Sequence, residues 1–231
     1  TRSACVTGVQ TCALPIFMGK ILGIGIPIAF QDGLIQVAFI IITIIANQRG
    51  LNDAAAVGIV EKVISFLFLV PSSMLSTVSA LCAQNIGAGK ADRVKKGILL
   101  SIFYTSIWCT LAIVASYTIG PWLVYMVTGS RNEVVITNAT NYLKFDTLFY
   151  YVTAVICVVR NAMQGLGEQI TPLVSSSLEM LGKIVIAFTL VPMLGYTGVI
   201  VAEPLVWFIM VIPLVVKIFR MPILHKAKEM P

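Results

Sequence analysis

The residues of this chain best suited to chemistry are ionisable side chains that interrupt long hydrophobic stretches. In the first stretch, Asp32 and Gln36 are four residues apart and would share a helical face with Thr43. Asp32 follows Pro27 by five residues, and a proline inside a helix leaves a backbone carbonyl without its donor. Asp32 could therefore take up a proton or attract a cation in an internal cavity. The alternative is a polar patch packed against another helix.

A pair of opposite charges lies in the fifth of these hydrophobic stretches, at residues 171–192. Glu179 and Lys183 are four residues apart, so they can pair across one helical turn. Glu179 could instead pair with Arg160 of the preceding stretch. Because pairing lowers the cost of burying both charges, we interpret this pair first as structural. A pair that breaks and re-forms would instead take up and release a proton.

Polar side chains also recur through the fourth hydrophobic stretch, residues 141–164, at steps of three or four residues. This spacing predicts one nearly continuous polar stripe along a helix. Its members are Asp146, Tyr150, Thr153, Cys157, Arg160 and Gln164. Arg160 could line or gate a cavity, or its side chain could extend to the lipid headgroups. The middle of this stretch has no carboxylate, and Thr153 is the nearest polar candidate there.

The composition shows which elements must position these side chains. Hydrophobic residues make up 58% of the chain and charged residues 11%, with a mean hydropathy of +0.95, which excludes a soluble domain. A spanning helix needs roughly 20 mostly apolar residues. The sequence predicts an all-α membrane protein with six transmembrane helices, at 20–46, 56–86, 97–127, 141–164, 171–192 and 197–219. Pro27, Pro71 and Pro213 fall inside these ranges and are expected to kink them.

Basic residues predict the orientation of the chain. The second connection carries Lys90, Arg93, Lys95 and Lys96, and the C-terminal region carries Lys217, Arg220, Lys226 and Lys228. Six spans place both groups on one side, which the positive-inside rule identifies as the cytoplasm. Residues 221–231 are then a basic cytoplasmic tail. The net charge of +6 indicates contact with anionic lipid and not with nucleic acid.

Motifs of hydrolytic enzymes and of cofactor or metal sites do not occur in the sequence. There is no GxSxG, HExxH or paired-carboxylate pattern, so we expect no enzyme activity. The three cysteines outside the leader, Cys82, Cys109 and Cys157, show no metal-binding spacing. We expect no cofactor and no metal site.

Residues 1–16 differ from the rest of the chain, because they belong to none of the six stretches. Residues 6–16 (VTGVQTCALPI) can be back-translated into a widely used sequencing-library adapter, and the next base fits Phe17. We therefore expect residues 1–16 to be non-native. The native protein would begin near residue 17 and would lack its own N-terminal part.

Several motifs, in order along residues 18–220, resemble the multidrug and toxic compound extrusion (MATE) family. AQNIGAGKADR at 83–93 is similar to the family's GQNxGAGxxxRA, with Ala83 replacing the first glycine. GIPIA at 25–29 and QGLG at 164–167 are further matches. GYTGVIVAEPLVW at 195–207 resembles GxxGxxxAxPxAW, with Glu203 where the family usually has asparagine.

This resemblance implies a twelve-helix transporter built from two six-helix lobes, of which residues 17–220 would be the C-terminal lobe. It implies a secondary antiporter that exports organic, often cationic, compounds in exchange for protons or sodium ions by alternating access. The partners would be a small organic substrate, the lipid bilayer and the missing N-terminal lobe. The location would be the inner membrane of a bacterium. Members of the family often have a carboxylate on the inner face of the fourth stretch. None lies in the middle of that stretch here, so the family's ion site does not carry over in full.

Two alternatives remain at this point. The first is a lipid-linked saccharide flippase of the same superfamily. Flippase cavities tend to be strongly cationic, whereas the candidates here carry mixed charge (Asp32, Arg160, Glu179 and Lys183). The second is a membrane interaction protein or inert fragment without transport activity. We expect little or no transport from these residues alone.

Overall fold

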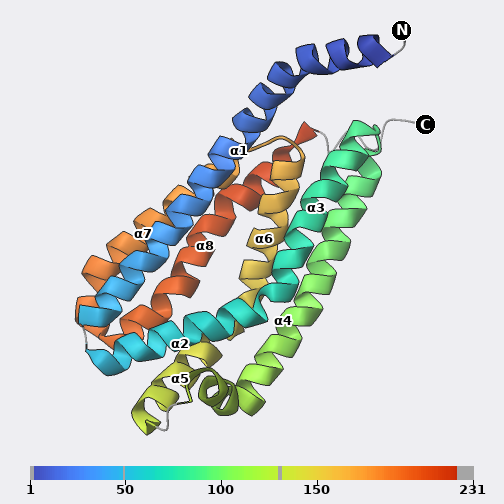
Figure 1. Ribbon diagram of the computed structural model, residues 1–231. Coiled ribbons are helices and arrows are strands. Elements are labelled where there is room, and N and C mark those ends of the chain that lie inside the picture. Colours follow the sequence, from blue (N-terminus) through green and yellow to red (C-terminus); the bar gives the residue numbers. More distant parts are fainter. Residues whose placement is uncertain (1–2, 49, 130–131, 223–231) are drawn as a thin grey trace.

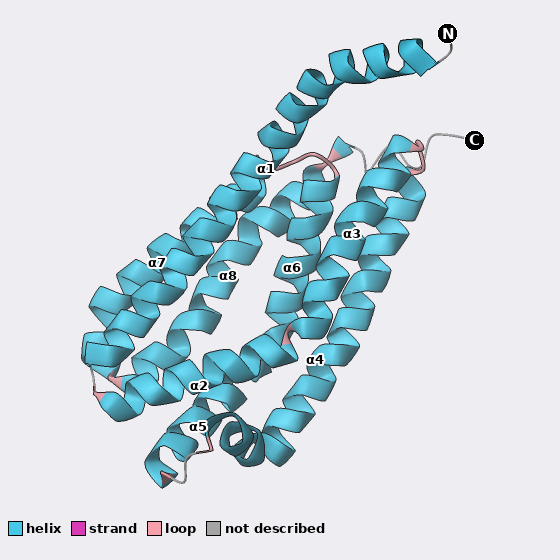
Figure 2. Ribbon diagram, in the orientation of Figure 1, coloured by secondary structure: helices cyan, strands magenta, loops and turns pink. Residues whose placement is uncertain are grey.

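The computed structural model describes residues 3–48, 50–129 and 132–222, and every regular element in these ranges is a helix (Figures 1 and 2). In chain order the helices are α1 (Ser3–Gln48), α2 (Leu51–Leu67), α3 (Leu69–Gly87), α4 (Ala91–Thr128), α5 (Glu133–Leu148), α6 (Tyr150–Gly165), α7 (Ile170–Leu194) and α8 (Tyr196–Arg220). α7 and α8 form a hairpin, and α1 packs along α7. α3 lies between α4 and α6.

The number of membrane spans agrees with the sequence prediction. Residues 21–48 of α1, together with α4, α7 and α8, are each long and apolar enough to cross a membrane. α2 with α3, and α5 with α6, satisfy the same test as pairs that bend by 50° and 56°. Counting each bent pair as one span gives six spans, and each predicted range overlaps one of them. The expected all-α membrane fold is therefore confirmed.

The bend between α2 and α3 has a local cause. Pro71 lies in the first turn of α3 and cannot donate to the carbonyl of Leu67, four residues earlier. The indole Nε1 of Trp108 on α4 donates to that carbonyl at 2.8 Å. A side chain from a neighbouring helix thus replaces the missing backbone hydrogen bond. Such a replacement leaves no backbone carbonyl without a donor in the membrane interior. The kink predicted at Pro71 is confirmed, with the junction at Phe68.

The bend between α5 and α6 was not anticipated. We expected one helix over 141–164, but the structure interrupts it at Phe149, so the stripe of polar residues does not follow one straight helix. No proline or glycine occurs between 133 and 164 to mark the break. The Phe149 ring packs against Phe145 at 5.3 Å and against Phe208 of α8 at 5.8 Å between centroids. The contact with Phe208 involves α8, which is distant in sequence.

The remaining predicted kinks do not interrupt their helices. α1 continues through Pro27 and α8 continues through Pro213. In the turn before Pro213, the hydroxyl of Ser175 on α7 donates to the carbonyl of Met210 at 2.9 Å. The backbone at the start of α1, residues 3–16, extends beyond the bundle (Figure 1). The non-native origin of residues 1–16 stays a prediction.

Glycines of the family-like motifs allow close helix packing. A Cβ on Gly165 of α6 would overlap the carbonyl of Ser79 on α3. A Cβ on Gly198 of α8 would lie 2.9 Å from both the Leu190 carbonyl oxygen and the Val191 Cα of α7. Gly195 joins α7 to α8 with a φ of +66°, in the left-handed region that favours glycine. Small residues at such contacts let helix backbones approach each other in a membrane.

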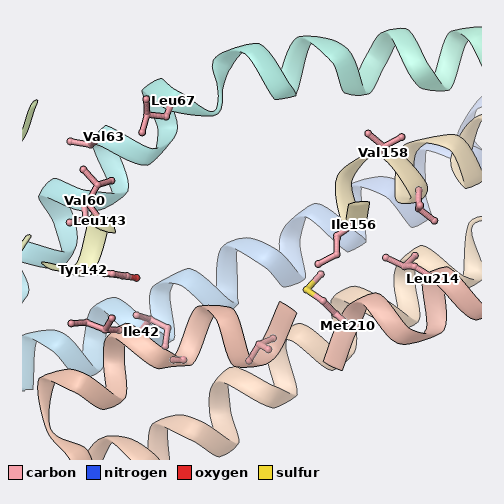
Figure 3. Packing of buried hydrophobic residues seen from close by; sticks show 14 of the residues in the cluster. Ile42, Val60, Val63, Leu67, Tyr142, Leu143, Ile156, Val158, Met210 and Leu214 are labelled. Atoms are coloured by element: carbon pink, nitrogen blue, oxygen red, sulfur yellow. The ribbon is translucent and has the colours of Figure 1, made fainter. Parts of the chain in front are cut away.

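A continuous hydrophobic core joins the two ends of the bundle. Figure 3 shows Ile42 of α1, Val60 and Leu67 of α2, Leu143 of α5 and Met210 of α8 along this core, and all five are buried. The outward surfaces carry many exposed large apolar side chains, such as Phe188 and Phe219. Such a surface is suited to lipid contact.

The second connection and the end of the last span, which carry the two basic groups of the sequence, lie at one end of the bundle. Lys90, in the turn between α3 and α4, and Arg220, at the end of α8, lie at the same end (Figure 1). At this end Glu168, in the connection from α6 to α7, pairs with Lys217 at 3.3 Å. Burial raises the pKa of the Glu168 carboxyl, but hydrogen bonds from Thr171 and the contact with Lys217 outweigh it, so the net pKa is lowered. The cytoplasmic assignment stays a prediction, and residues 223–231 of the proposed tail lie outside the described residues.

Candidate functional site

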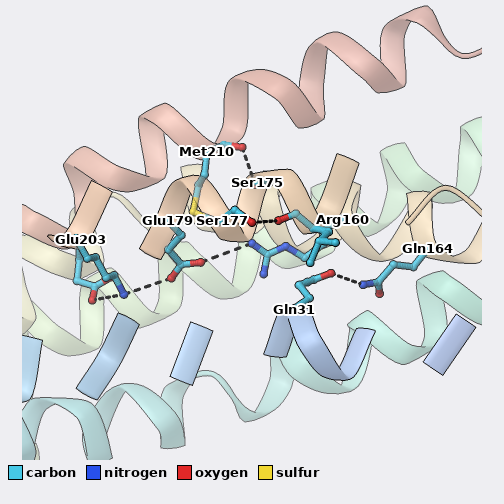
Figure 4. Close-up of polar contacts among 10 residues, drawn as sticks. Gln31, Arg160, Gln164, Ser175, Ser177, Glu179, Glu203 and Met210 are labelled. Carbon is cyan, nitrogen blue, oxygen red and sulfur yellow. Dashed lines mark hydrogen bonds and ion pairs between the residues drawn. The ribbon is translucent and has the colours of Figure 1, made fainter. Parts of the chain in front are cut away.

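Four side chains of alternating charge form a chain through the interior of the bundle (Figure 4). Arg160 Nη2 of α6 lies 3.8 Å from Glu179 Oε2 of α7. Glu179 Oε1 lies 3.3 Å from Lys183 Nζ on the same helix. Lys183 Nζ lies 2.8 Å from Glu203 Oε1 of α8. The chain therefore connects α6, α7 and α8 through charged contacts.

Both pairings foreseen for Glu179 occur together in the structure. The i,i+4 spacing on α7 places Glu179 and Lys183 on one face, and α7 packs with that face towards α8. Lys183 is 0% exposed and Glu203 4% exposed. The Lys183 ammonium also lies 4.0 Å from the ring centroid of Phe39 on α1. These four charged groups, on α6, α7 and α8, are largely buried, with the Phe39 ring of α1 beside Lys183.

Two further carboxylates lie within electrostatic range of this chain. Asp146 of α5 is 1% exposed and interacts with Glu203 and Lys183. Glu61 of α2 interacts with the same two residues, and the Thr43 hydroxyl of α1 donates to its Oε1 at 3.3 Å. We call the resulting group the interior charge cluster; it comprises Glu61, Asp146, Arg160, Glu179, Lys183 and Glu203.

The interior charge cluster contains more acids than bases. With every member ionised, four carboxylates face two cations. Excess negative charge in a low-dielectric interior is unfavourable, and a carboxylate there takes up a proton or attracts a cation. Four carboxylates beside two cations can therefore hold a proton or a monovalent cation.

Several buried polar atoms beside the cluster have no hydrogen-bond partner among the described residues. They include Thr153 Oγ1 of α6, whereas Asp146 and Tyr150, on either side of the junction of α5 and α6, interact with each other. Unpartnered polar atoms are costly in a membrane interior and need a proton, water or ion as partner. Thr153, which the sequence identified as the polar candidate of this stretch, lies among them.

The first stretch places its polar residues on two sides of α1. Gln31 is buried and accepts a hydrogen bond from Gln164 Nε2 of α6 at 3.0 Å (Figure 4). Asp32 and Gln36, the candidates from the sequence, are exposed and do not join the interior charge cluster. An exposed carboxylate within a span cannot face lipid without a cost of about 3 kcal/mol.

Three acids of the cluster, Glu61, Asp146 and Glu203, were not identified as site residues from the sequence. Glu203 carried a signal, since it stands where the family motif usually has asparagine. Asp146 was noted only as the first member of the polar stripe. Glu203 and Asp146 lie on elements whose contact with α7 or α2 becomes visible only in the packed bundle.

Comparison with known proteins extends this description. The MatE family model matches residues 27–189, which is more than half of the chain. A curated relative, "Probable multidrug resistance protein YoeA" of Bacillus subtilis (strain 168), is 25% identical over 171 residues. That match covers 74% of this chain and 36% of the relative.

Solved structures share the fold at low sequence identity. An outward-facing multidrug resistance MATE family transporter of the MOP superfamily superposes with a TM-score of 0.80 at 15% identity, covering 92% of this chain and 48% of its own. An inward-facing MATE family transporter gives 0.74 at 16% identity, covering 91% and 49%. A MOP superfamily transporter from Pyrococcus furiosus, described as having a binding pocket of reverse polarity, gives 0.78 at 15% identity, covering 91% and 47%.

The chain spans about half the length of these solved structures and about a third of the curated relative. The family model matches a continuous segment from α1 to α7. The chain therefore belongs to the MatE family of membrane transporters.

Proposed function

We propose that this chain is the C-terminal lobe of a secondary antiporter that exports organic, mainly cationic, compounds in exchange for protons or sodium ions. The excess of carboxylates in the interior charge cluster carries the proposal, because a group that must bind and release protons or cations supplies the coupling. The bilayer, a small organic substrate and an N-terminal lobe are the partners. The protein would lie in the inner membrane of a bacterium, with its basic end in the cytoplasm.

The exposed face of α1 supports a second part of this proposal. Asp32 and Gln36 lie on the surface of the bundle, and a carboxylate at that depth requires water or protein beside it. A central cavity between two lobes provides both. Asp32 would attract a cationic substrate there, while Asp146 and Glu61 inside the lobe exchange the coupling ion. Alternating access would move this lobe against the other around the cavity.

Efflux from cells tests the proposal directly. The full-length protein is produced in a strain without its own exporters, and efflux of a fluorescent organic cation is recorded with a proton gradient or a sodium gradient. Asp146→Asn should abolish efflux against a concentration gradient, and Asp32→Asn should reduce efflux of cationic compounds more than that of neutral ones. Asp92→Asn, at the exposed start of α4, is the matched control. Full active efflux by Asp146→Asn would contradict its coupling role.

A flippase for lipid-linked saccharides is less consistent with these residues. A site for an anionic lipid diphosphate needs an excess of cations, whereas the interior charge cluster has an excess of acids. The same assay distinguishes the two functions, since a flippase would leave the efflux of organic cations unchanged.

A further inference from the structure

The surroundings of Lys183 have the composition of a cation-binding site. Its Nζ lies 3.3 Å from Glu179 Oε1 and 2.8 Å from Glu203 Oε1, so two carboxylates from two helices converge on one ammonium group. The face of the Phe39 ring covers the same group at 4.0 Å. Carboxylate oxygens and an aromatic face are the groups with which proteins hold monovalent and ammonium cations.

The balance of charge explains why this site contains a lysine. With Lys183 present, each of the two carboxylates has a cation beside it, because Arg160 contacts Glu179 from the other side. Without the ammonium group, Glu203 would keep no cation within 4 Å among the described residues. Glu203 is 4% exposed and Lys183 0% exposed, so bulk water does not reach the Glu203 carboxylate to stabilise its charge.

We propose that Glu179, Glu203 and Phe39 form a site for a monovalent cation, and that the Lys183 ammonium occupies it as a tethered internal cation. The site therefore needs no ion from solution. Glu179 and Glu203 are withdrawn from ion exchange, which leaves Asp146 and Glu61 as the acids of the interior charge cluster without a cation in direct contact. This inference concerns binding at one site and does not depend on transport by the protein.

Removing the Lys183 side chain should open the site to a free ion. The test uses the full-length protein in detergent and measures the unfolding temperature in NaCl, KCl or choline chloride at equal ionic strength. In Lys183→Ala, a small cation should raise the unfolding temperature by about 1–5 °C relative to choline, as expected for a ligand at ten to a hundred times its dissociation constant. The wild type should show a smaller difference, due only to other ion sites.

Two variants separate this site from general effects of salt. Lys183→Met fills the same space without charge, so it should gain less from Na⁺ than Lys183→Ala. Lys183→Ala with Glu203→Gln removes one carboxylate, and the added response to Na⁺ should disappear. Poor folding of Lys183→Ala in choline with recovery in NaCl would support the site equally. The proposal is overturned if Lys183→Ala responds no more than the wild type, if it fails to fold in every salt, or if the double variant keeps the full response.

Discussion

The contact between Lys183 and Glu203 provides the sharpest test of the packed bundle. Their charged atoms are 2.8 Å apart, closer than Lys183 is to Glu179 at 3.3 Å, and Lys183 is fully buried. Removing one partner of a buried ion pair typically costs about 3–5 kcal/mol. Because Lys183 keeps Glu179 at 3.3 Å, we expect the lower end of this range for Glu203→Gln. Glu203→Gln keeps the size of the side chain, so this cost is electrostatic. In a protein about twice this length, as the matched structures are, about 3 kcal/mol corresponds to a fall of roughly 3–6 °C in unfolding temperature.

A double-mutant cycle isolates the pair. Lys183→Met with Glu203→Gln removes both charges and leaves the Arg160–Glu179 pair intact, so it should recover most of the stability lost in either single variant. The coupling energy should be at least about 1.5 kcal/mol, within the range found for contacting residues. The assay is thermal unfolding of the full-length protein in detergent. A fall of less than about 2 °C in Glu203→Gln, or additive effects in the double variant, would refute the reasoning.

Three further predictions concern helix packing, the α2–α3 bend and pH. Gly165→Ala should destabilise by about 1–3 kcal/mol in thermal unfolding, because its Cβ meets an α3 carbonyl; Gly33→Ala, with open space around it, should be neutral or slightly stabilising. Trp108→Phe should cost about 1 kcal/mol by the same assay, because it leaves the carbonyl at the bend unpaired, and an unchanged unfolding temperature would contradict this role. The lowered pKa of Glu168 means that its pair with Lys217 stabilises the protein above the pKa of the unfolded state, near 4.5, and is lost as pH falls through the lower folded value. The difference in unfolding temperature between wild type and Glu168→Gln should therefore be present at pH 7 and disappear at acidic pH, and a difference that grows on acidification would exclude this explanation.

Hydropathy and local spacing predicted much of this protein. The six spans followed from the lengths of the apolar stretches, because a membrane admits only helices that satisfy their own backbone groups. The kink at Pro71 followed from the missing backbone donor. The contact between Glu179 and Lys183 followed from the helical repeat alone, since residues four apart share a face.

The break at Phe149 could not be predicted in this way. It has no proline or glycine signal, and the ring that marks it packs against α8, about sixty residues further along the chain. The same limitation applies to the polar stripe of the fourth stretch. A helical period predicts which residues share a face only while the helix remains straight.

The sequence by itself determined the elements and the local pairs of this protein, because apolar length, proline chemistry and the helical repeat act over a few turns. Only the tertiary structure decided which charges meet. Glu203 reaches Lys183 across the α7–α8 hairpin, Arg160 reaches Glu179 from α6, and Asp146 lies close enough to interact with both Lys183 and Glu203. Electrostatic energy depends on distance and burial, and neither is defined until the helices have packed.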